Sequence, residues 1–129
     1  DRCKTAFAFR SLLDQEAVLA FGSDWPSGAL SPLHGLAAAV QRKTADGRHP
    51  GGFAPEQKIS IEEALRAYTQ GGAHAALTPK ETGIGRLVVG GAADLVVLDH
   101  DLFTMDPSDY ERTGVDLTMV NGVVTFRRK

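Results

Sequence analysis

The sequence has little of what marks disulfide-stapled, membrane-spanning or nucleic-acid-binding proteins. Its 129 residues include one cysteine, Cys3, so neither an internal disulfide nor a cysteine-rich zinc site can form. No apolar run approaches the roughly 20 residues of a membrane-spanning helix, and no signal peptide opens the sequence. The net charge of -2 argues against a strong grip on nucleic acid or anionic lipid. These absences predict a cytoplasmic protein with no nucleic-acid or membrane partner.

The residues that are present predict a globular α/β chain, with 43% hydrophobic and 23% charged residues. An apolar run at 17–21 lacks polar alternation, which is typical of a strand buried on both faces of a parallel sheet. Ser31 and Pro32 are favoured at the start of a helix, and the apolar spacing extends that helix over 32–44.

A second helix is predicted over 61–77. It opens with the capping box Ser60-Ile61-Glu62-Glu63, in which the serine and the second glutamate bond each other's backbone amides. Its apolar face then becomes small at Gly72, Ala75 and Ala76, which predicts a close approach to a neighbouring element there.

After about residue 83 the pattern changes to strands. Strands are predicted over 86–89, 95–98, 118–120 and 123–126. Asn121-Gly122 separates the last two and predicts a tight hairpin, because a type I′ turn needs positive φ at both positions.

The candidate chemistry lies at Gly22-Ser23-Asp24, directly after the predicted inner strand. In a barrel of alternating strands and helices, catalytic groups gather where the strands end, and a carboxylate there can bind a metal and accept a proton from water. An aspartate before Trp25-Pro26 can equally form a turn by bonding its own backbone. The pattern alone favours the turn, and both interpretations stay open at this point.

Several stretches, in this order, resemble the amidohydrolase superfamily, and more narrowly its family 3 branch, which includes N-substituted formamide deformylase-like proteins. They are Phe9-Arg10-Ser11-Leu12-Leu13, Leu19-Ala20-Phe21-Gly22-Ser23-Asp24-Trp25-Pro26, the helix 61–69, Gly85-Arg86-Leu87 with Gly90, the strand 93–99, and the hairpin 120–124. The resemblance covers nearly the whole chain.

The resemblance implies a C-terminal fragment of a metal-dependent hydrolase. Residues 1–82 would be the end of a (β/α)8 barrel, with its last strand and helices, and 83–129 the C-terminal strands of a small β-sandwich. Asp24 would be a catalytic residue and a metal ligand, and Ser23, Trp25 and Pro26 would border the substrate pocket. The parent would use a divalent metal, zinc, to hydrolyse an amide, formamide or cyclic-amide bond of a small molecule.

Some family features have no counterpart here. The first-strand His-x-His pair and the middle-strand histidines are absent, and none of the four histidines has metal-pair spacing. A catalytic zinc normally takes three protein ligands, so the fragment alone is expected to bind no metal and to be inactive. His34 is expected to be solvated or to cap its helix.

The same absences leave a second hypothesis open, that of a free-standing, non-catalytic binding or scaffolding domain derived from the hydrolase. The incomplete barrel also predicts self-association or rearrangement, because a lone inner strand at 17–21 needs neighbours for its backbone hydrogen bonds.

Overall fold

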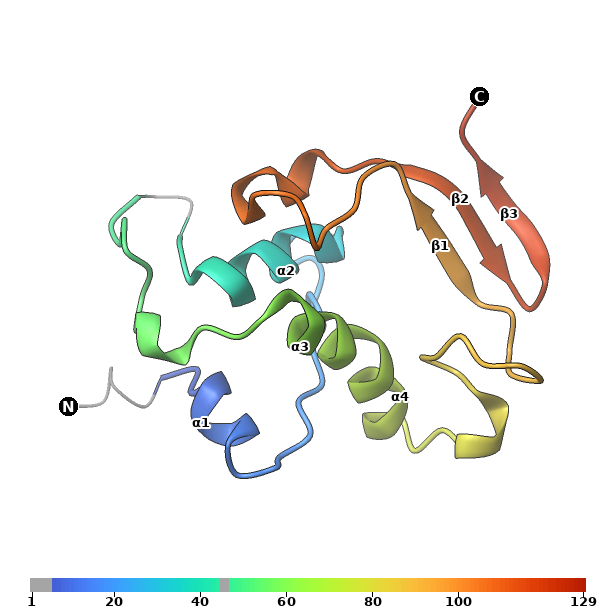
Figure 1. The fold of residues 1–129 in the computed structure, drawn as a ribbon, viewed down its shortest axis with the longest axis horizontal. Coiled ribbons are helices and arrows are strands. Elements are labelled where there is room, and N and C mark those ends of the chain that lie inside the picture. Colours follow the sequence, from blue (N-terminus) through green and yellow to red (C-terminus); the bar gives the residue numbers. More distant parts are fainter. Residues whose placement is uncertain (1–5, 45–46) are drawn as a thin grey trace.

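The computed structural model describes residues 6–44 and 47–129, with helices at one end of the molecule and a small sheet at the other (Figure 1). None of the helices in these ranges is both long and apolar enough to cross a membrane. The helices and strands, in chain order, are α1 (Phe9–Leu13), α2 (Pro32–Gln41), α3 (Ile61–Arg66), a π-helical turn (Ala67–Gly71), α4 (Gly72–Ala75), β1 (Leu95–Leu98), β2 (Val115–Val120) and β3 (Val123–Arg127); short 3-10 helices lie at Pro55–Gln57, Lys80–Thr82 and Pro107–Arg112.

Helix α2 begins as predicted and ends earlier than predicted. The Ser31 hydroxyl accepts a hydrogen bond from the Leu33 amide, and Pro32 is the first helical residue. Its last residue is Gln41, so the predicted boundary at 44 was wrong. Arg42 leaves the helix at φ 60°, in the left-handed region, and its side chain bonds the backbone carbonyl of Phe53.

The helix predicted over 61–77 forms as three consecutive pieces, α3, the π-helical turn and α4, and ends at Ala75. The capping box is present: Glu63 N–H donates to the Ser60 hydroxyl, and Ser60 N–H donates to the Glu63 carboxylate. Arg10 of α1 donates to the same carboxylate at 2.8 Å, so the start of this helix also anchors α1. Leu77, at φ 55°, lies beyond the helix end.

We expect Ser60→Ala to lower the free energy of unfolding by about 1 kcal/mol, because the Glu63 amide loses its cap. Ser60→Thr keeps the hydroxyl and is the matched control. It should lower the free energy of unfolding by only about a few tenths of the Ser60→Ala value. Urea denaturation of both variants checks the difference; equal stabilities would show that the cap contributes nothing.

The β-rich end is a three-stranded antiparallel sheet in the order β1-β2-β3. The predicted hairpin is confirmed, since Asn121 and Gly122 have φ of 49° and 77°. The strand predicted at 86–89 does not form, because within the described ranges no strand lies beside it to supply a hydrogen-bond ladder. This sheet is the only one in residues 6–44 and 47–129, so the second layer of a sandwich is not formed by them.

The segment 17–21, predicted as an inner strand, pairs with no strand in the described part of the chain. Its backbone makes two hydrogen bonds, from Ala17 N–H to the Leu12 carbonyl and from Phe21 N–H to the Ala67 carbonyl. A parallel strand draws its hydrogen bonds from neighbouring strands on both sides, and neither of these two bonds comes from a strand.

The core is small and lies between α2, α3 and the segment 99–113. A compact monomer of 13.8 kDa exposes about 6,600 Å². This chain exposes 8973 Å², and its exposed large apolar side chains include those of Phe7, Val18, Trp25, Leu30, Leu77, Leu87, Val89 and Phe126. The excess, about 2,300 Å², is on the scale of an obligate protein–protein interface.

Candidate functional site

Asp24 occupies a tight turn immediately after the segment 17–21. Its φ is 50°, in the left-handed region that L-residues with a side chain rarely adopt, and its carbonyl accepts a hydrogen bond from the Ser27 amide at 2.8 Å. Aspartate tolerates this conformation better than most residues, and Arg42 and Leu77 share it, so the angle defines the turn and does not by itself mark a site. The turn is tight enough that a Cβ on Gly28 would lie 2.5 Å from the Ser23 carbonyl oxygen.

The carboxylate of Asp24 does not form the turn. Within residues 6–44 and 47–129, no donor is hydrogen-bonded to it. Two other aspartates show what a turn-forming carboxylate does here: Asp101 accepts from the Phe103 amide at 2.9 Å, and Asp106 accepts from the Ser108 amide at 2.8 Å. The turn interpretation of Asp24 therefore lacks the hydrogen bond that defines it.

The three residues predicted to border a substrate pocket share this turn. Ser23 is half-buried, while Trp25 and Pro26, joined by a cis peptide bond, are exposed. Two hollows among the described residues lie around Gln70 and His74, and the turn lines neither of them. The pocket assignment of Ser23, Trp25 and Pro26 stays a prediction.

What positions the turn is the packing of the segment before it. The Phe21 ring lies between Phe9 and Tyr68, with ring centroids 4.9 and 5.6 Å away. Gly71 brings its helix against the same segment, because a Cβ at Gly71 would lie only 1.9 Å from the Leu19 carbonyl oxygen. The close approach was predicted at Gly72, Ala75 and Ala76, and this placement was wrong. It occurs at Gly71, while an added Cβ at Gly72 would meet nothing within 4 Å and Ala75 and Ala76 are exposed.

The histidines do not gather near Asp24. His34 pairs with Glu111 through Nδ1 at 2.9 Å, and His100 lies against Asp99 at 2.7 Å. In the described ranges, no group of three or more His, Cys, Asp and Glu is arranged to hold a metal ion. The donor set of these residues therefore does not fit a metal centre by itself, and Asp24 could contribute one carboxylate at most.

Two residues with structural roles were not predicted from the sequence: Gly71, which packs against this segment, and Arg42, which joins the end of α2 to Phe53 and Ala6. The adjacent glycines Gly71-Gly72 inside a helix were a usable signal, since glycine destabilises helices and needs a packing reason. Nothing in the sequence distinguished Arg42 from the neighbouring basic residues at the end of α2.

Comparison with known proteins shows the class. Residues 1–126 match the model of the amidohydrolase family, and the chain belongs to that family. It is 32% identical over 128 residues to YtcJ of Bacillus subtilis (strain 168), covering 99% of this chain and 24% of that protein. It is also 34% identical over 122 residues to N-substituted formamide deformylase of Arthrobacter pascens, covering 95% of this chain and 22% of that enzyme.

Solved structures agree on the fold. Atrazine chlorohydrolase TrzN of Arthrobacter aurescens TC1, complexed with zinc, superposes with a TM-score of 0.60 at 30% identity, over 92% of this chain and 27% of that one. An amidohydrolase of Thermotoga maritima MSB8 gives a TM-score of 0.66 at 24% identity, over 95% and 26%. The chain thus spans about a quarter of the length of the relatives it matches.

Proposed function

We propose that this chain is the C-terminal portion of a metal-dependent hydrolase that cleaves a non-peptide carbon–nitrogen bond of a small molecule. Family membership supports the hydrolase class, and N-substituted formamide deformylase, a relative, supports the bond type. The observation that carries the site is Asp24, a carboxylate in a left-handed turn with no hydrogen-bond donor among the described residues.

In the proposed enzyme, Asp24 would be one ligand of a divalent metal, and its carboxylate would accept a proton from the attacking water. Zinc, the metal in the complexed TrzN structure, would supply the lowered pKa of water that hydrolysis near neutrality needs. The remaining ligands belong to polypeptide outside these residues, because the described ones form no metal cluster. Ser23, Trp25 and Pro26 border the substrate.

The exposed surface supports the proposal that this chain is a portion of a larger protein. An excess of about 2,300 Å² matches what a chain would bury against the remainder of a larger protein. The unpaired segment 17–21 points the same way, since its missing backbone partners would be neighbouring barrel strands. A free-standing binding domain would be expected to have a surface closer to the compact value.

The test is Asp24→Asn in a family-length protein that contains this sequence. We expect kcat/KM for N-substituted formamides to fall by about 1,000-fold or more, because asparagine can neither take the proton nor ligate zinc as an anion. Asp109→Asn is the matched control, since Asp109 is on the surface and pairs with Arg112; its activity should be unchanged. Equal activity of wild type and Asp24→Asn would remove the proposed role.

A further inference from the structure

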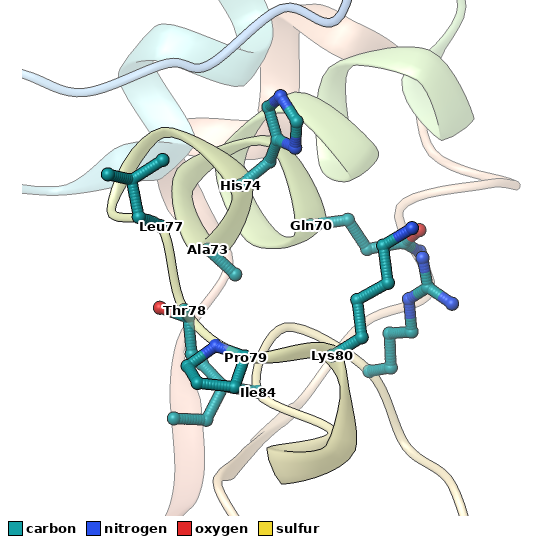
Figure 2. A pocket seen from close by; sticks show the side chains of 9 residues that line it. Gln70, Ala73, His74, Leu77, Thr78, Pro79, Lys80 and Ile84 are labelled. Atoms are coloured by element: carbon teal, nitrogen blue, oxygen red, sulfur yellow. The ribbon is translucent and has the colours of Figure 1, made fainter.

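A second feature of the chain lies away from the Asp24 turn: a hollow of about 230 Å³ where α4 gives way to the 3-10 helix Lys80–Thr82. Figure 2 shows His74, Gln70 and Lys80 around one side of it, and Leu77, Thr78 and Pro79 on the other. Every residue that lines it comes from the continuous stretch 70–86, so the hollow is built locally.

The walls of the hollow differ in chemistry. The apolar wall is formed by Ala73, Leu77, Pro79 and Ile84. The polar wall carries the side chains of Gln70, His74, Lys80 and Arg86, all hydrogen-bond donors, and no aspartate or glutamate lines the space.

The cations of this wall are not neutralised by the protein. Elsewhere in the described ranges, Arg10, Arg66, Arg112 and Arg128 each have a carboxylate within ion-pair distance. Within the same ranges, neither Lys80 nor Arg86 has one. A second hollow of about 550 Å³ shares Gln70, His74, Lys80 and Arg86 with the first; Glu63, the carboxylate that lines it, is paired with Arg10.

We propose that this hollow binds a small organic carboxylate with a short aliphatic body. Lys80 and Arg86 provide charge-assisted hydrogen bonds to the carboxylate, and the half-buried Gln70 amide adds a neutral donor. The aliphatic body lies against Leu77 and Ile84, two apolar side chains that are exposed in this chain. The proposal needs neither Asp24 nor a metal.

The experiment is a titration of a family-length protein that contains this sequence, isotope-labelled in the segment 70–86, at constant ionic strength, with butyrate, butyramide and inorganic phosphate, followed by backbone amide NMR shifts. We expect butyrate to shift signals of residues 70–86 with a dissociation constant on the order of 1 mM, because the ligand is small and the site open. Butyramide should cause no such shifts, and phosphate should bind more weakly.

The matched variants decide whether the site is specific. Lys80→Gln with Arg86→Gln should weaken butyrate binding about tenfold. Lys58→Gln with Arg127→Gln removes the same charge from exposed positions outside the hollow and should leave it unchanged. Absence of shifts at 70–86, equal loss in both double variants, or phosphate binding as tightly as butyrate would each overturn the assignment.

Discussion

Gly71→Ala should destabilise the chain by about 2 kcal/mol or more, although alanine is the better helix former. Gly71 has helical angles, φ -62° and ψ -44°, so alanine costs nothing in backbone geometry and by propensity alone would add up to about 1 kcal/mol. The steric clash makes the net change in stability unfavourable, because the new Cβ would lie 1.9 Å from the Leu19 carbonyl oxygen and 3.2 Å from the Ala20 Cα. Backbone cannot rotate away as a side-chain end can, so the helix and the segment 17–21 must separate.

The adjacent glycine is the control. Gly72 is also helical, at φ -60° and ψ -46°, but an added Cβ would meet nothing within 4 Å. Gly72→Ala should therefore stabilise the chain by about 0.5–1 kcal/mol. Urea denaturation of the two variants measures both shifts. If they had the same sign, the contact between this helix and residues 19–20 would not exist in solution.

Arg42→Met should lower the free energy of unfolding by about 2 kcal/mol, since the guanidinium joins three segments. Arg42 is 7% exposed; it donates to the carbonyls of Phe53 at 3.0 Å and Ala6 at 3.3 Å, and its Cζ lies 5.0 Å from the Phe9 ring centroid. Burial lowers the pKa of Arg42 because it disfavours the charged form. Part of the stabilisation from the carbonyl and ring contacts therefore offsets this desolvation cost. Methionine keeps the apolar stem but leaves both carbonyls without their charged donor.

Arg112→Met provides the comparison, because Arg112 is exposed and forms a surface ion pair with Asp109 at 3.2 Å. Its loss should cost less than about 0.5 kcal/mol. Thermal unfolding of both variants, followed by circular dichroism, checks the contrast. A cost for Arg42→Met no larger than that for Arg112→Met would mean that desolvation cancels the carbonyl and ring contacts.

The elements predicted well from sequence are those whose determinants are local. The capping box at Ser60–Glu63, the start of α2 at Ser31-Pro32 and the Asn121-Gly122 hairpin each depend on residues within four positions of one another, and each is present. The strand at 95–98 is also present, with a sheet partner in β2.

The predictions that failed depended on partners distant in sequence. The apolar composition of 86–89 suits a strand, but strand formation requires another strand alongside, and the described residues offer none. The segment 17–21 also has no strand beside it among the described residues, and its place as the last barrel strand stays a proposal. The end of α2 was missed because Arg42 bonds Phe53 and Ala6, contacts that helical periodicity does not encode.

The candidate site was also predicted only in part from the sequence. Asp24 was singled out by its position after an apolar run and by the order of family-like motifs, and the family is confirmed. That its carboxylate is free of the turn hydrogen bond, unlike Asp101 and Asp106, became visible only in three dimensions. Its roles as catalytic residue and metal ligand remain proposals.

By itself, the sequence determined the helix starts and the hairpin, because short-range spacing and capping chemistry encode both, while the family and the candidate carboxylate were predicted from the resemblance of ordered motifs to known amidohydrolases. Only the tertiary structure decided that Gly71, and not Gly72, is the point of contact with residues 19–20, and that Arg42 ends its helix to bind two distant carbonyls. The physical reason is that steric contact and burial depend on which segments meet in space, and two adjacent glycines of one helix face different surroundings.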